Sequence, residues 1–143
     1  MTQETIYMNI CVCIDDNRGM SFLKKRLSRD RLLIEKLLSH TEYNKIYISK
    51  YSLPLFEEYV DPRITVTDTF PRDEEGALCF FELESILEYD KDIQGLVIYK
   101  WNRRYPSDKK FPYMPEDKGY ALISAVDFEG NSHELITEEV WKR

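Results

Sequence analysis

The stretch of residues 93–112 constrains the fold more than any other part of the chain. Its first half alternates between two apolar faces, with Leu96 and Ile98 on one and Val97, Tyr99 and Trp101 on the other. A strand that is apolar on both faces belongs in the middle of a sheet that is covered on both sides. We therefore expect residues 96–99 to form an inner strand of a layered α/β domain.

A polar loop follows this strand directly. It spans residues 102–108, carries Arg103, Arg104 and Tyr105, and contains Pro106, which cannot continue a strand ladder. In α/β proteins ligands bind beyond the carboxyl ends of the strands, and loops held by a rigid sheet commonly carry the binding side chains. The sequence thus indicates where a site lies but leaves its chemistry open.

The remaining chain alternates short strands with short helices. Strands are expected at residues 8–15, 44–49, 63–70, 77–81 and 120–128. Ser28 is the expected cap of a helix over residues 29–40, Ser52 caps a short helix with Pro54 in its first turn, and Ser85 begins a helical turn. This order predicts a single α/β domain over residues 1–143, with a mostly parallel, twisted central sheet between layers of helices.

Two local predictions concern turns. Gly19 is expected to take a positive φ in the turn after the first strand. Residues 131–134 have the spacing of a capping box, and Ile136 and Val140 are four residues apart, so local rules favour a helix there. The choice between helix and strand for residues 131–143 nevertheless stays open.

Composition indicates a soluble globular protein, with 43% hydrophobic and 32% charged residues among 143. Because no apolar run reaches membrane-spanning length and the start lacks the regions of a signal peptide, we expect a cytoplasmic protein. One interpretation makes Met8 the native start and residues 1–7 a disordered extension. Cys11, Cys13 and Cys79 lack the spacing of metal ligands, so we expect reduced core thiols and no metal site.

Charge is segregated along the chain. Eleven of the twenty Lys and Arg side chains fall within residues 18–31 and 100–110, where only Asp30 and Asp108 oppose them, although the net charge is −6. Cations held within about 10 Å of one another are only partly screened at physiological salt. We therefore expect these segments to form an anion-binding patch, the alternative being a solvated face that only confers solubility.

Three segments resemble dihydrofolate reductase in the same order. MNICVCIDDNRGM resembles its first strand and mobile active-site loop, and LSRDRLLIEK resembles its first helix. YPSDKKFP and NSHELITEEVWKR resemble its glycine-aspartate loop with Phe-Pro and its C-terminal segment. The resemblance implies a dihydrofolate reductase-like three-layer sandwich, with Asp30 as the catalytic acid and only ionisable group of a pterin pocket.

The residues expected at an NADPH site depart from this family. The reductases hold the cofactor pyrophosphate at a Gly-Gly turn, because only glycine lets backbone N–H groups approach the phosphates. Here the corresponding place reads Phe81-Glu82-Leu83-Glu84-Ser85, although Lys50 and Ser52 match positions that contact phosphate. Since two carboxylates would repel the cofactor, NADPH is disfavoured and normal hydride chemistry is expected to be lost.

The stretches NRRYPSD and NSHE also resemble small uncharacterised bacterial proteins that sometimes carry the label ribonuclease Z. Nucleases of that name bind two zinc ions through a histidine-rich motif, whereas this chain has only His40 and His133. We therefore do not expect zinc-dependent nuclease activity.

Each candidate site residue has a structural alternative. Asp30 is either a pocket acid or a carboxylate that stabilises its helix start, and His133 is either a general base or a capping residue. Lys50 and Ser52 either contact phosphate or serve as a surface lysine and a helix cap. The expected ligand-binding residues are Lys24, Lys25, Arg26, Lys50, Ser52, Trp101, Arg103, Arg104 and Tyr105.

Three functions are consistent with these features. The first is a binding protein of dihydrofolate reductase-like fold for an anionic, nucleotide- or pterin-like small molecule, without normal NADPH use. The second is an active NADPH-dependent reductase with an altered cofactor site. The third is an interaction module that binds nucleic-acid phosphates through the basic loops and stacks bases on Trp101 and Tyr105, which the negative net charge disfavours. No membrane partner is expected, and the sequence leaves the oligomeric state open.

Overall fold

The computed structural model describes residues 8–143, so the expected extension at residues 1–7 lies outside the described range. The strands of the main sheet are β1 (Met8–Ile14), β4 (Lys45–Ile48), β5 (Ile64–Val66), β6 (Ala77–Phe80), β7 (Ile93–Lys100), β9 (Ala121–Phe128) and β10 (Ile136–Lys142). A small second sheet contains β2 (Gly19–Phe22), β3 (Lys25–Arg26) and β8 (Lys109–Lys110). The helices are α1 (Arg31–Leu38), α2 (Leu53–Phe56) and α3 (Ile86–Tyr89), with 3-10 turns at Asp90–Asp92 and Pro115–Lys118.

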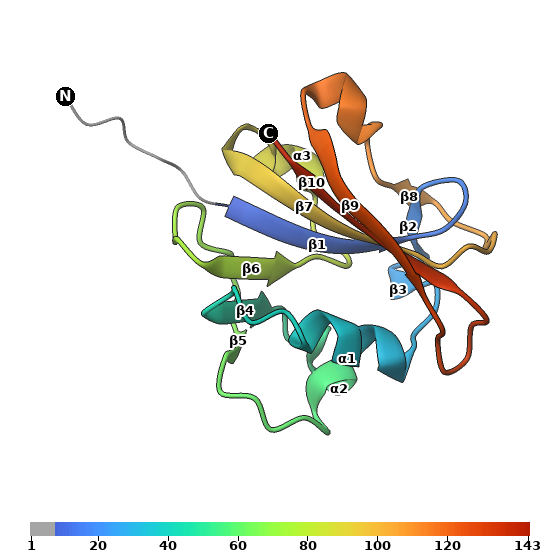
Figure 1. Ribbon diagram of the computed structural model, residues 1–143, viewed down its shortest axis with the longest axis horizontal. Coiled ribbons are helices and arrows are strands. Elements are labelled where there is room, and N and C mark those ends of the chain that lie inside the picture. Colours follow the sequence, from blue (N-terminus) through green and yellow to red (C-terminus); the bar gives the residue numbers. More distant parts are fainter. Residues whose placement is uncertain (1–7) are drawn as a thin grey trace.

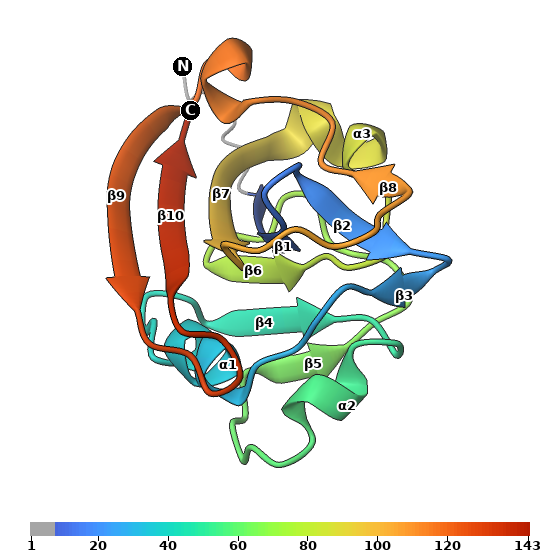
Figure 2. The same cartoon turned by 90° about the vertical axis from the view of Figure 1, so that its right-hand side faces the viewer.

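The main sheet has the strand order β5-β4-β6-β1-β7-β10-β9, and the small sheet has the order β3-β2-β8 (Figures 1 and 2). The five strands from β5 to β7 are mutually parallel, whereas β10 and β9 pair antiparallel at the other edge. The predicted α/β fold with a mostly parallel central sheet is therefore confirmed. No helix within residues 8–143 has the length and apolar character needed to cross a membrane.

The central strand β7 contributes to two hydrophobic cores, one on each side of the sheet. Val97 and Tyr99 pack in the core that also contains the buried side chains of α1 and α2. Leu96 and Ile98 pack in the opposite core, which contains the buried side chains of α3. The two faces predicted from the apolar pattern are confirmed, and β7 is paired on both edges, with β1 and with β10.

Helix α1 begins two residues later than predicted, because Asp30 rather than Ser28 is its cap. The Asp30 carboxylate accepts a hydrogen bond from the N–H of Leu32 at 2.9 Å. Ser28 instead forms a hydrogen bond with His133. Arg29 consequently lies before the helix, so only Arg31 places a positive charge in the first turn.

The turn after β1 places the positive φ on Arg18 (61°) and not on Gly19 as predicted. Gly19 is required for another reason: a Cβ at this position would lie 2.5 Å from Ser107 Oγ and 2.9 Å from Asp15 Oδ1. The glycine therefore allows the loop after β1 to approach the loop after β7.

The C-terminal segment is the strand β10, so the helix favoured by local rules is wrong. In the folded protein, β7 and β9 lie on either side of this segment and supply hydrogen-bond partners for its backbone N–H and C=O groups. These partners stabilise a strand, and local sequence rules do not take them into account. The inward face of β10 includes the carboxylate of Glu138, which obscured the alternation typical of a strand. Glu138 Oε2 accepts hydrogen bonds from Tyr99 Oη at 2.6 Å and from His40 Nε2 at 2.7 Å.

The bond from His40 to Glu138 should make stability depend on pH. The Glu138 carboxylate raises the pKa of His40 above its usual value, against a smaller effect of burial. The resulting stabilisation, about 1 kcal/mol, is complete below the unfolded histidine pKa of about 6.5 and is lost as pH rises through the higher folded pKa. Urea unfolding between pH 5.5 and 9 should show this loss of stability. Glu138→Gln should abolish the pH dependence, and an unchanged dependence of stability on pH in that variant would show that the bond between His40 and Glu138 is not its cause.

Candidate functional site

The loops after β1 and β7 are joined by the buried carboxylate of Asp15. Its Oδ1 accepts hydrogen bonds from the N–H groups of Asn17 (2.9 Å) and Gly19 (2.6 Å), and its Oδ2 accepts from the N–H of Tyr105 (2.9 Å). Burial raises the pKa of Asp15, but the three backbone donors outweigh burial and hold the pKa below its usual value. An ionised side chain thus fixes both loops against each other.

The small sheet then brings the two basic segments together beyond the ends of β1 and β7 (Figure 1). In it, β2 pairs with β8, with Gly19 opposite Lys110 and Ser21 opposite Lys109. The N–H of Leu23 also donates to Asp108 Oδ2 at 3.1 Å. The predicted meeting of these segments on one side of the molecule is confirmed.

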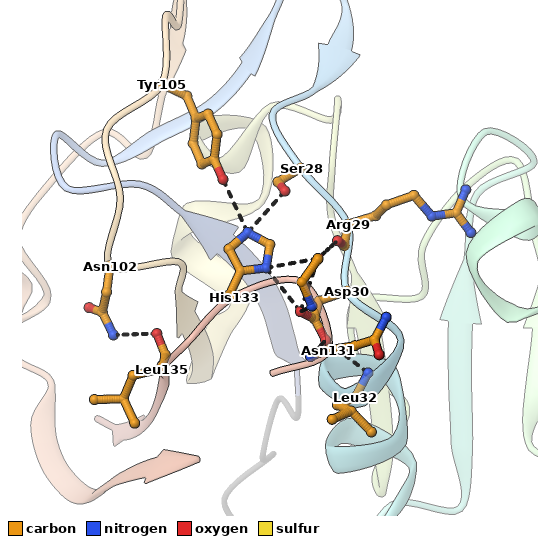
Figure 3. Close-up of polar contacts among 10 residues, drawn as sticks. Ser28, Arg29, Asp30, Leu32, Asn102, Tyr105, Asn131, His133 and Leu135 are labelled. Carbon is orange, nitrogen blue, oxygen red and sulfur yellow. Dashed lines mark hydrogen bonds and ion pairs between the residues drawn. The ribbon is translucent and has the colours of Figure 1, made fainter. Parts of the chain in front are cut away.

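A second buried carboxylate, that of Asp30, joins the start of α1 to the turn before β10 (Figure 3). Besides Leu32, its Oδ1 accepts from the N–H of Asn131 at 2.8 Å. Its Oδ2 accepts from the N–H of Ser132 at 2.8 Å and from Nδ1 of His133 at 2.9 Å. Ser132 Oγ is a fifth donor, 3.2 Å from Oδ2. The side chain is 0% exposed, so groups of the chain itself surround the carboxylate.

The charge of Asp30 determines the tautomer of His133. Burial raises the pKa of Asp30, but the donors from residues 131–133 outweigh burial and lower the pKa to about 2. Because an ionised carboxylate only accepts hydrogen bonds, Nδ1 of His133 carries a proton. Its Nε2 then faces Ser28 Oγ at 3.0 Å and Tyr105 Oη at 3.1 Å, and the ring stacks on Trp101 with centroids 4.6 Å apart.

Ser28, His133 and Asp30 have the hydrogen-bond order of a serine-hydrolase triad. Two features oppose that chemistry. Nε2 lies within hydrogen-bond distance of Tyr105 Oη as well as Ser28 Oγ, so it does not serve Ser28 alone. The cavity beside Ser28 has a volume of about 20 Å³, which is room for one water molecule and not for an acyl group. We interpret the cluster as a structural latch between the turn before β10 and the start of α1.

The cavity also bears on the predicted pterin pocket. It is lined by Asp30, Trp101 and side chains of α1 and β6, where the reductase resemblance puts that pocket. Asp30 is directed into the latch, and Trp101 is 4% exposed beneath His133. A role for Asp30 as catalytic acid stays a prediction, to which the low pKa and full burial give no support.

The turn predicted to replace the phosphate-binding glycines is held by carboxylates of the chain itself. Glu82 accepts two hydrogen bonds from Arg26, from Nε at 2.9 Å and from Nη2 at 3.0 Å, and one from Ser52 Oγ at 2.7 Å. Glu84 Oε1 accepts from the N–H of Glu82 at 2.9 Å. Arg26 also lies over the ring of Tyr51, 4.3 Å from its centroid. Donors suited to a phosphate are therefore bound to side-chain carboxylates.

The predicted ligand-binding residues separate into two groups. Arg26, Ser52 and Trp101 are engaged in internal contacts, and Ser52 makes no capping bond to α2, contrary to expectation. Tyr105 is half-buried, with its hydroxyl on His133. The remaining members, which form no ion pair within residues 8–143, are Lys24, Lys25, Lys50, Arg103 and Arg104.

Sequence reasoning missed the partners of Asp30 and Glu82. His133 was considered alone, and Asp30 lies 103 residues before it, so no local spacing joins them. Arg26 and Glu82 are 56 residues apart. The signal in the sequence is the surplus of hydrogen-bonding residues in 131–133, whose spacing also fits a capping box.

Comparison with known proteins supports the fold. No family model matches the chain, and no curated protein matches it by sequence, so the likeness to proteins labelled ribonuclease Z finds no support. Among solved structures, dihydrofolate reductase from Enterococcus faecalis, complexed with NADP(H) and RAB-propyl, is similar with a TM-score of 0.66. The identity is 11%, and the alignment covers 95% of each chain. The likeness establishes a dihydrofolate reductase-like fold.

The latch predicts a large effect of a small substitution. Asp30→Asn should destabilise the fold by about 2 kcal/mol or more, because an amide would turn an N–H₂ group towards the donors on residues 131–133. In the parent protein, the stabilisation from the ionised Asp30 is complete above about pH 4 and is lost as pH falls towards 2, because the pKa of Asp30 is lower in the folded state than in the unfolded state. Urea unfolding at pH 7 and pH 3 tests both statements. Asn131→Ala, which keeps its backbone donor, is the matched control and should change stability by less than about 0.5 kcal/mol.

Proposed function

We propose that this chain binds a phosphate-bearing small molecule through its basic loops, on a dihydrofolate reductase-like scaffold that does not use NADPH in the usual way. The observation that carries the proposal is a hollow with cations and no acid in its wall. It is lined by Asn17, Arg104, Tyr105, Pro106, Ser107 and Lys110, has a volume of about 430 Å³, and is called the basic hollow below.

Side chains in the basic hollow are arranged to receive an anion. Lys110 Nζ donates to the carbonyl of Asn17 at 3.3 Å and to Ser107 Oγ at 3.2 Å, which holds the ammonium group in place. Arg104 is exposed and forms no ion pair within residues 8–143. A guanidinium group binds phosphate oxygens in pairs, and an ammonium group adds a point charge.

Another cationic hollow beside the small sheet is a weaker candidate. It contains Lys24 and Lys109, but its wall also includes Asp108. This carboxylate accepts a hydrogen bond from Leu23 and offsets part of the positive charge. The two lysines of β8 line different hollows, because successive side chains of a strand point to opposite faces. The anion is assigned to the hollow that contains Lys110.

The two other candidate functions have less support. Normal reductase chemistry requires cofactor phosphates to bind at the turn after β6. There, the carboxylates of Glu82 and Glu84 already accept the hydrogen bonds of Arg26, Ser52 and a backbone N–H. Nucleic-acid binding loses one of its stacking platforms, because Trp101 is covered by His133. A net charge of −6 also opposes a polyanion more strongly than a single phosphate group.

Inorganic phosphate should stabilise the protein against heat. At ten times its Kd it should contribute about 1.4 kcal/mol, which raises Tm by about 4 °C for a domain of this size. The increase should shrink with added sodium chloride. Arg104→Glu combined with Lys110→Glu should abolish it.

The control has the same charge change in the other hollow. Lys24→Glu combined with Lys109→Glu should retain most of the phosphate response. A response that is equal in both double variants, or absent from the parent protein, would refute a specific site in the basic hollow.

The purified protein should not oxidise NADPH with dihydrofolate, because carboxylates occupy the turn that binds cofactor phosphates in the reductases. Absorbance at the NADPH band, followed with and without dihydrofolate, measures this directly. Turnover that disappears in Asp30→Asn, in protein shown to be folded, would establish the reductase function instead.

A further inference from the structure

A second, larger hollow lies on the face of the sheet opposite α1 and α2. Its floor comes from the hydrophobic core on that side, and its volume is about 550 Å³. Hollows of roughly 300–1,000 Å³ are typical of small-molecule sites. Its wall includes Arg18, Phe111, Tyr113, Glu116, Leu122 and Trp141, and it is called the aromatic hollow below.

The aromatic hollow adjoins the basic hollow. Asn17 lines both, and Arg18, the next residue, lines the aromatic hollow. A molecule bound across Asn17 therefore has one end beside Arg104 and Lys110 and the other against the aromatic side chains of the wall. This arrangement suits a ligand with a phosphate at one end and a flat ring at the other.

Arg18 is held in an unfavourable backbone conformation. Its φ of 61° lies in the left-handed region, which is unfavourable for a residue with a side chain. Hydrogen bonds fix it there, from its N–H to Asp15 O at 3.0 Å and from the N–H of Phe111 to its carbonyl at 2.8 Å. Its Nε is buried and has no hydrogen-bond partner, and no carboxylate within residues 8–143 pairs with it. Strain and an unpartnered donor at the junction of two hollows are typical of a binding residue.

Acidic side chains define which ring fits. Asp16 and Glu116 lie at the aromatic hollow and form no ion pair within residues 8–143, so their carboxylates are available as acceptors. Glu139, also in its wall, is occupied by Lys100 at 3.0 Å and by Trp141 Nε1 at 3.0 Å. Free carboxylates beside aromatic rings bind ring N–H and amino groups, and they repel a second phosphate.

We propose that the aromatic hollow binds the amino-bearing ring of a nucleotide-sized ligand, with Arg18 bridging to a phosphate in the basic hollow. The phosphate end of this inference rests on the proposed function, whereas the ring end stands on the aromatic hollow alone. None of the residues that line the aromatic hollow lines the 20 Å³ cavity beside Asp30 and Trp101. The aromatic hollow is therefore distinct from the place where the reductase resemblance puts the pterin.

Four probes separate the two ends of the ligand. Inorganic phosphate tests the basic hollow, and guanosine tests the aromatic hollow. GMP carries both the phosphate and the amino-bearing ring. UMP carries the phosphate with a smaller ring that lacks an amino group. Titration calorimetry on the parent protein should give GMP a Kd at least tenfold lower than those of phosphate and UMP, with measurable binding of guanosine. GMP no tighter than phosphate would overturn the inference and leave the phosphate site standing. Guanosine binding without phosphate binding would support the aromatic hollow and refute the basic one.

Two variants test the assigned residues. Leu122 is 48% exposed at the wall of the aromatic hollow, so Leu122→Trp should fill it without unfolding the protein and should raise the Kd of GMP to that of phosphate. Leu87→Trp, at a 64% exposed position of α3, is the matched control and should leave GMP binding unchanged.

Arg18→Gly relieves the left-handed backbone, so it should maintain or raise Tm while raising the Kd of GMP at least tenfold. Undiminished GMP binding in both Leu122→Trp and Arg18→Gly would refute the site.

Discussion

The parallel pairing of β1 with β7 is the constraint on which the rest of the molecule depends. Both strands are buried on both faces, so the chain must supply covering layers above and below them. Because the strands are parallel, their carboxyl ends meet at one edge, and the loops that follow are forced together there. Asp15 then joins the two loops through three backbone hydrogen bonds. The position of the basic loops is thus a consequence of how the centre of the sheet is built.

Buried carboxylates bind donors that lie far from them in the sequence. Asp30 takes the donors at the start of α1 and in the turn before β10, and Glu82 takes Arg26 and Ser52. Each has strong hydrogen-bond partners, which compensates for removing its charge from water. Side-chain anions thus hold together both the start of α1 and the turn after β6. The basic hollow and the aromatic hollow lie elsewhere, beside β8 of the small sheet and on the face of the main sheet opposite α1 and α2.

The sequence predicts the features that local patterns control and misses those that depend on distant partners. The two faces of β7 follow from its alternating apolar residues, and these were correct. The start of α1 was placed at Ser28, because the bonds that make Asp30 the cap include partners about a hundred residues away. The sequence leaves β10 open between helix and strand, because its inward Glu138 looks polar until Tyr99 and His40 are beside it. Arg26 was taken for a ligand residue, because nothing near it in sequence reveals Glu82.

The latch at Asp30 has a consequence for how the chain reaches its final state. Helix α1 has eight residues, a length that is marginal in isolation. The groups that complete its cap lie 101 to 103 residues further along the chain. Ribosomes add about 5–20 residues per second, so the N-terminal half waits roughly 5–20 seconds for these groups to be synthesised. During that interval the ionised Asp30 remains hydrated and α1 is weakly held. Closure at the start of α1 is therefore delayed until residues 131–133 have been synthesised, and shorter nascent chains remain open to proteolysis.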